Sequence, residues 1–131
     1  MRNSIAAAFV FSSLLMFRSL AWGNAVPEVP LEEKSRRSDL VVIASVSSIA
    51  ADGCLRNSRC AHLQISSFLK GAPREAVVVA FDGPIAEQNP KCCAVGATYL
   101  LFLRRVKDNT FEAVNGPFGI YPIATGVTRG E

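Results

Sequence analysis

Four cysteines are the residues of this chain best suited to chemistry. Five residues separate Cys54 from Cys60, whereas Cys92 and Cys93 are adjacent. This is not the spacing of a zinc knuckle, and His62 is the single histidine that could complete a metal site. An even number of cysteines in an exported chain is typical of disulfides, so we expect two disulfides, no metal and no cofactor. Four cysteines allow three pairings, and their spacing alone does not choose one.

The other polar candidates do not form a recognisable catalytic set. His62 alternates with apolar residues, which favours a solvated outer strand face over a ligand-binding face. Asp82, Glu87 and Asp108 are isolated carboxylates in predicted turns, with no sign of a second carboxylate placed for acid/base chemistry. The nucleophile motif G-x-S-x-G is absent from the sequence. We therefore expect no enzymatic activity and assign no catalytic residue.

Two short basic clusters and one aromatic segment could bind a partner, as the alternative to a purely structural or solvated role. Arg104–Lys107 ends a predicted strand and is typical of a solvated strand edge. Arg56 and Arg59 lie in the loop of the first two cysteines, where binding of an anionic partner is the alternative to simple solvation. In the segment 116–121, Phe118 and Ile120 are expected to close one end of the barrel, and an apolar surface of Phe118 and Tyr121 for a protein partner is the alternative.

The N-terminal segment 1–25 has the order of a secretory signal peptide: a basic start, an apolar run and small residues. The apolar run is shorter than the ~20 residues of a membrane-spanning helix. Cleavage fits after Ala21 or Ala25, and we favour Ala25. Removing Arg2 and Arg18 leaves 12 of the 14 basic residues against 11 acidic ones, a net charge of +1. We expect a secreted or periplasmic protein without a membrane anchor after cleavage and without a basic patch for nucleic acid.

The remaining sequence predicts one all-β domain at 38–124, between an arm at 26–37 and a flexible tail at 125–131. Helical turns are expected at Leu31–Arg37. Alternating residues, apolar runs and turn signals predict strands at 40–49, 60–69, 76–81, 95–103 and 110–114. Five short strands favour a closed or partly closed barrel, because closure removes unpaired edges. The segment 95–103 is apolar on both faces, so we expect one face in the core and the other covered by Leu31–Arg37.

Short motifs along these strands carry a resemblance to a known family. Ser38-Asp39-Leu40 opens the first strand, Leu69-Lys70-Gly71 ends the second, and Cys93 precedes Val95-Gly96 and the run Tyr99–Leu103. This order resembles the netrin-like, or tissue inhibitor of metalloproteinases-like, family of OB folds. The resemblance implies an OB-like, five-stranded Greek-key barrel with a short N-terminal helical turn. It extends from residue 38 to about residue 123, and its motifs are structural rather than catalytic.

The resemblance also implies a pairing of the cysteines. Because the first and fourth strands of an OB barrel are neighbours, Cys92 and Cys93 are expected near the loop that holds Cys54 and Cys60. We therefore expect each of Cys54 and Cys60 to bond one of Cys92 and Cys93. The alternative is a local Cys54–Cys60 bond together with a vicinal Cys92–Cys93 bond.

The best-known activity of that family does not transfer to a residue of this chain. Its inhibitors chelate a protease zinc through a cysteine at the mature N-terminus, whereas the N-termini expected here are Trp22 and Val26. The favoured hypothesis is an exported, monomeric, non-enzymatic module that binds an unknown protein or other macromolecular partner through its loops. The alternative is a metalloprotease inhibitor that inserts another segment, the arm at 26–30.

Overall fold

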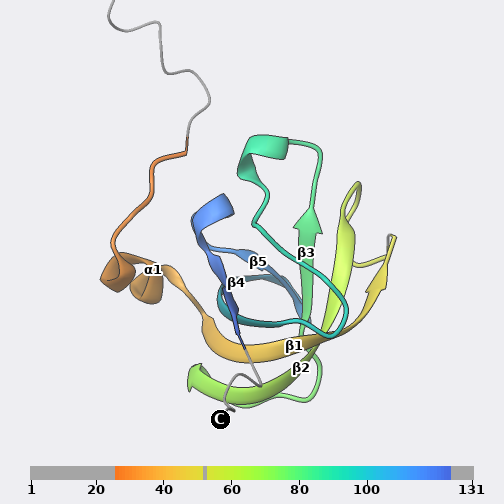
Figure 1. Cartoon of the computed structure of the whole chain (residues 1–131), viewed down its shortest axis with the longest axis horizontal. Helices are drawn as coiled ribbons and strands as arrows, with labels where there is room; N and C mark the ends of the chain where they lie inside the picture. Colours follow the sequence, from red (N-terminus) through yellow and green to blue (C-terminus); the bar gives the residue numbers. More distant parts are fainter. Residues whose placement is uncertain (1–25, 52, 125–131) are drawn as a thin grey trace, which may run out of the picture.

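Strands are the main secondary structure of the chain that the computed structural model describes, which is residues 26–51 and 53–124 (Figure 1). The expected signal peptide at 1–25 and the tail at 125–131 lie outside these residues. One short helix precedes the strands, and two single 3-10 turns, labelled η2 and η3, interrupt them. The order is α1 (Leu31–Arg37), β1 (Leu40–Ala50), β2 (Arg59–Lys70), β3 (Val78–Asp82), η2 (Ala86–Gln88), β4 (Thr98–Lys107), β5 (Thr110–Ala113), η3 (Gly116–Phe118) and β6 (Ile120–Ile123).

The sheet closes on itself as a five-stranded barrel. Its strands follow the order β1-β2-β3-β5-β4, and β1 pairs with β4 to complete the circle. The β3–β5 pair is parallel, and every other pair is antiparallel. The short strand β6 continues along β4 where β5 ends, since Leu103 pairs with Ala113 and Leu101 pairs with Ile120. The expectation of an all-β, OB-like barrel with one N-terminal helical turn is confirmed, and β6 is an additional short strand.

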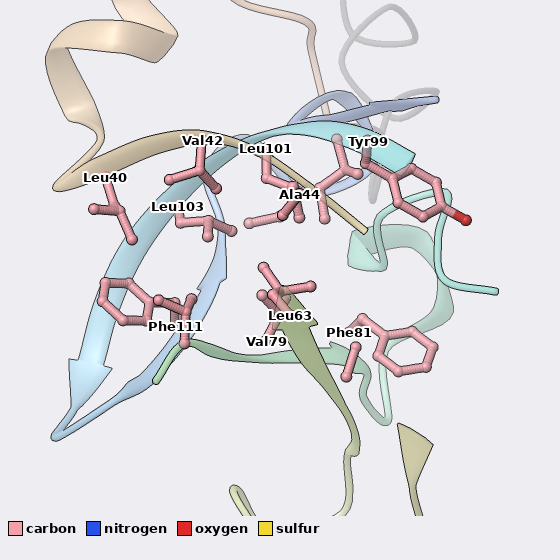
Figure 2. Packing of buried hydrophobic residues seen from close by; sticks show 14 of the residues in the cluster. Leu40, Val42, Ala44, Leu63, Val79, Phe81, Tyr99, Leu101, Leu103 and Phe111 are labelled. Carbon is pink, nitrogen blue, oxygen red and sulfur yellow. The ribbon is translucent and has the colours of Figure 1, made fainter. Parts of the chain in front are cut away.

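Alternation along the strands fills the barrel interior. On β2, Ala61 and Leu63 are buried while His62 and Gln64 are exposed, as their alternation predicts. Figure 2 shows side chains from different strands pointing toward one another inside the barrel. This inner cluster includes Leu40, Val42, Ala44, Leu63, Val79, Phe81, Tyr99, Leu101, Leu103 and Phe111.

The outer face of β4 is also apolar and covered. Phe102 forms a second cluster with Val41 and Val114, and Leu100 and Tyr121 pack against it. The rings of Phe102 and Tyr121 meet edge to face, with their centroids 6.1 Å apart. The helix α1 lies against this side of the barrel, as the apolar faces of the segment predict.

The fourth strand begins later than its apolar sequence predicts. It starts at Thr98 rather than at Val95, whose side chain is 63% exposed. Gly96 has a positive φ of 89°, and the Ala97 N–H bonds to the carbonyl of Ala94, which makes this segment a tight turn. The local turn therefore overrides the continuous apolar pattern.

The motif residues that suggested the fold join α1, β1, β2 and β4. The Ser38 hydroxyl donates to the Lys34 carbonyl, and Lys70 Nζ donates to the Ser35 carbonyl at 2.7 Å, so both satisfy the C-terminal end of α1. Asp39 Oδ2 accepts the backbone N–H of Arg105 on β4. Gly71 has a φ of 96°, and a Cβ there would lie 2.7 Å from the Asp39 carbonyl. These residues stabilise the barrel by joining its strands to α1.

Candidate functional site

The disulfides correct the pairing that we expected. Cys54 bonds Cys60, with their Cα atoms 6.1 Å apart, and Cys92 bonds Cys93. The strands β1 and β4 do pair, but their ladder ends at Ser45 opposite Thr98. Beyond that point β1 continues to Ala50 with β2 as its partner, and it carries the loop of Cys54 past the end of β4. The hypothesis of two bonds between the loops is therefore wrong, and the local alternative is the one observed.

Two adjoining hollows lie at the end of the barrel next to the Cys54–Cys60 loop. The larger one has a volume of about 670 Å³ and is lined by the loop, by Asp82 and by Lys107. The smaller one, of about 180 Å³, lies between the loop and the β3–β4 connection. Leu55, Arg56 and Ser58 line both hollows, which makes them one continuous surface. We call this surface the barrel-end groove.

Both walls of the barrel-end groove are held in place by covalent or hydrogen bonds. The Cys54–Cys60 bond closes the loop wall, where Ser58 is buried. On the other wall, Asn89 Oδ1 accepts the Gly83 N–H at 3.0 Å, and its amide nitrogen donates to the Gly83 carbonyl and to Asp82 Oδ1. One side chain thus fastens the β3–β4 connection to the end of β3. A groove with such walls needs little ordering when a partner binds.

Small side chains at the floor leave the space of the smaller hollow open. Ala80 on β3 pairs with Glu112 on β5, and both line the hollow together with Ala113. Pro84 and Ile85 line the far wall, and Ile85 is 50% exposed. A half-exposed isoleucine beside an alanine floor leaves apolar surface available to a partner.

The larger hollow carries an excess of positive charge among the residues that line it. Among the described residues that line this hollow, Arg56, Arg59 and Lys107 accompany one carboxylate, that of Asp82. Arg59 pairs with Asp82 at 3.3 Å, and its guanidinium lies 5.1 Å from the centre of the Phe81 ring. In the described part of the chain, neither Arg56 nor Lys107 has an ionic partner. This end of the groove favours an anionic group.

The candidates from the sequence are distributed over different parts of the surface. His62 is exposed on the outer face of β2 with Gln64 and Ser66, away from both hollows. Glu87 lies on η2 and Asp108 in the turn between β4 and β5, and both are exposed. Of the predicted carboxylates, only Asp82 lies in the groove, and the described residues that line it bring no nucleophile and base together.

Two residues of the basic cluster at the end of β4 bind neighbouring residues of the chain, and a third lines the groove. Arg104 forms an ion pair with Glu112 at 2.6 Å on the neighbouring strand, and the Arg105 side chain donates to the Asp108 carbonyl. Lys107 alone of this cluster reaches the groove. Ile120 of the aromatic segment is buried in the core as expected, whereas Phe118 is half-buried and belongs to neither core cluster. Tyr121 packs against the second apolar cluster.

Lys34 on α1 is the one buried charged residue in the described ranges, with 1% of it exposed. Its ammonium lies 4.8 Å from the centre of the Tyr121 ring and donates to the Tyr121 hydroxyl and to Glu28 at 3.1 Å. Burial opposes the charged form, but the hydrogen bonds to Tyr121 and Glu28 outweigh it and raise the pKa of Lys34. With its donors engaged, Lys34 fastens α1 and the arm to β6.

The arm ahead of α1 is also fastened to the barrel. Asn115 Oδ1 accepts the Val29 N–H at 2.9 Å, and Asn115 Nδ2 donates to the Pro27 carbonyl at 2.9 Å. Asn115 has a φ of 63°, a conformation that asparagine tolerates better than most residues. The arm from Pro27 onward therefore lies along the barrel.

Metal and membrane features can be assessed over residues 26–51 and 53–124. No group of three or more His, Cys, Asp or Glu side chains there is placed to hold a metal ion. The same ranges contain no helix with the length and apolar character needed to cross a membrane.

The sequence did not reveal the barrel-end groove. Its apolar half depends on Ala80, Ala113 and Ile85, which come from three separate segments. The available signal in the sequence is Ile85, a large apolar residue in the otherwise irregular connection after Pro84.

Comparison with protein-family models and with curated proteins finds no match to this chain.

Proposed function

We propose that this protein is an exported, non-enzymatic OB-like module that binds a protein partner in the barrel-end groove. The observation that carries the proposal is the continuity of the two hollows. An apolar half around Ile85 and a basic half around Arg56 share one surface between two fastened walls. Surfaces that combine exposed apolar groups with a polar rim are typical of protein-binding sites.

The proposal includes secretion or a periplasmic location and a monomeric state. Two disulfides support it, because disulfides persist in oxidising compartments. The order of a signal peptide at 1–25 supports the same location. The resemblance of the motifs to the netrin-like family remains part of this proposal, and the OB-like strand order is in keeping with it.

Metalloprotease inhibition through the arm is the less favoured function. An inserting segment must offer its backbone to the protease, yet Asn115 binds the Pro27 carbonyl and the Val29 N–H. Lys34 also holds Glu28. These contacts favour a structural role for the arm and leave the groove as the preferred site.

The test is site-specific photo-crosslinking in the compartment to which the protein is exported. A photoreactive amino acid replaces Ile85 in the groove and, as the control, Gln64 on the exposed face of β2. We expect a discrete covalent adduct with one protein from position 85 and none from position 64. Adducts from position 64 alone would contradict the groove and favour the outer face of β2. The absence of an adduct at both positions would contradict protein binding by either surface.

A further inference from the structure

We propose that the barrel-end groove binds an extended segment of its partner that presents one apolar side chain followed by acidic side chains. The inference rests on the proposed function and adds the chemistry and direction of the ligand. It follows from the different character of the two hollows, which share Leu55, Arg56 and Ser58. The apolar side chain occupies the smaller hollow, and the carboxylates lie over the larger one.

The smaller hollow has the size of one side chain. At about 180 Å³ it holds about six waters at roughly 30 Å³ each, which a single leucine or methionine side chain would displace. Leu55, Pro84 and Ile85 give it apolar surface beside polar lining residues, and Ala80 lies at its floor. The carboxylate of Glu112, which also lines it, is paired with Arg104. The volume is below the range of about 300–1,000 Å³ that is typical of small-molecule sites. A side chain of a larger partner is therefore the better occupant.

The larger hollow favours acidic residues next to the apolar side chain of the partner's segment. The lining of this hollow, as far as residues 26–51 and 53–124 form it, has three cationic side chains and one carboxylate, and that carboxylate is engaged by Arg59 and Asn89. Arg56 and Lys107 remain for a ligand. Cationic side chains at the rim of a surface attract carboxylates and repel lysine-rich segments, so they set specificity as well as association rate.

Carboxylates fit this surface better than nucleic acid does. Proteins that bind single strands combine positive charge with aromatic side chains on which the bases stack. The described residues that line the two hollows include no aromatic side chain. The mature chain expected from the sequence carries a net charge of +1, which is low for a phosphate-binding surface.

The test uses isotope-labelled protein and three synthetic peptides in NMR titrations at low ionic strength. The first peptide carries one leucine followed by three glutamates. The second has lysines in place of the glutamates, and the third has glycine in place of the leucine. We expect the first peptide to shift the amide signals of Leu55, Ser58, Ala80 and Ile85 and to bind at least about tenfold more tightly than the other two. Equal affinity for the three peptides, shifts elsewhere, or no binding overturns the inference.

Variants locate the two halves of the site. Ala80→Leu fills the smaller hollow, and Arg56→Glu with Lys107→Glu reverses the charge of the larger one. Each is expected to weaken binding of the first peptide about tenfold, while Gln64→Glu on the outer face of β2 leaves it unchanged. Because Ala80 is buried, Ile85→Asp serves as a second apolar-half variant at an exposed position. Full binding in both apolar-half variants, or in the charge-reversed variant, overturns the assignment of that half.

The two experiments separate the two claims. If crosslinking at position 85 succeeds and the acidic peptide fails, the partner chemistry is wrong and the groove stands. If neither succeeds, the proposed function fails as well.

Discussion

Two regions on the outside of the barrel differ in what covers them. The outer face of β4 presents Phe102 and Leu100, and the chain covers it with Tyr121 and with α1. The barrel-end groove presents Ile85 above a floor of Ala80, and no described segment covers it. Figure 1 shows α1 and the β1–β2 loop on opposite sides of the barrel. The comparison shows that the chain uses its own segments to bury one apolar surface and leaves another open.

The hydrogen bonds in the two regions differ in the same way. On the covered side, Lys34, Glu28 and Tyr121 bind one another, so a partner would have to break these contacts to bind there. In the groove, the side chain of Asn89 satisfies backbone groups of the wall, while Arg56 and Ile85 still face solvent. The first arrangement stabilises the fold, and the second fixes the shape of a surface without filling it. Variants should therefore affect stability on one side and binding on the other.

The largest effect is expected inside the barrel, on which both regions depend. Leu101→Asp places a carboxylate where the side chain is fully buried among the strands, and no cation is available to pair with it. We expect no cooperative unfolding transition by circular dichroism. Leu69→Asp is the matched control, since Leu69 is 57% exposed, and it should change stability by no more than about 0.5 kcal/mol. A soluble Leu101→Asp variant with a cooperative transition would contradict the central position of β4.

Loss of the lysine on the covered side should come next. Lys34→Ala removes a buried stem and leaves the Tyr121 hydroxyl without its donor, so we expect about 3 kcal/mol lower stability in denaturant unfolding. Lys91→Ala, at an exposed lysine, is the control and should change little. Binding of the acidic peptide by folded Lys34→Ala protein should be unchanged, because Lys34 does not line the groove. A loss of that binding would show that the two regions are coupled.

The stability difference between the wild-type protein and Lys34→Ala should depend on pH in one direction. The pKa of Lys34 is raised above its ordinary value of 10.5, which is the value it takes in the unfolded chain. Its contribution is therefore complete below pH 10.5 and decreases as the pH rises through the higher pKa of the folded state. The stability gap between the wild-type protein and Lys34→Ala should be constant at neutral pH and narrow only in strong alkali. A gap that narrows between pH 6 and pH 9 would contradict the contact with Glu28 and Tyr121.

The disulfide of the groove should have an intermediate effect on stability and a clear one on binding. Replacing Cys54 and Cys60 with alanine releases a loop with a sequence separation of 6, for which chain entropy gives about 2 kcal/mol. Because this loop forms one wall, we also expect weaker binding of the acidic peptide by titration. Replacing Cys92 and Cys93 is the control, since their bond closes no loop and neither residue lines the groove. Equal loss of binding in the two double variants would show that the loop wall has no special role.

The alternation of buried and exposed residues along a strand could be predicted from the sequence. Features that depend on the register and contacts between strands could not. Alternation at His62 and Leu63 identified both faces of β2 correctly. The apolar pattern predicts a strand from Val95, whereas β4 begins at Thr98, because apolar character alone does not indicate the turn at Gly96. The cysteine pairing failed because strand neighbours alone do not give register, and the β1–β4 ladder ends before the loop begins. The groove could not be predicted for the same reason. Ala80 forms part of a hollow only because residues from separate segments lie around it.

The smallest effect on stability and the sharpest test of the comparison come from two exposed residues of one connection. Ile85 and Val95 lie between β3 and β4 and are 50% and 63% exposed, but only Ile85 lines the groove. Aspartate at either position should change the free energy of unfolding by no more than about 0.5 kcal/mol, because neither side chain belongs to a core cluster. Ile85→Asp should nevertheless weaken binding of the acidic peptide about tenfold, through lost apolar contact and an added like charge, while Val95→Asp binds normally. If both variants bind the acidic peptide equally well, Ile85 is an exposed residue without a role in binding. The groove is then not an open apolar surface for a partner.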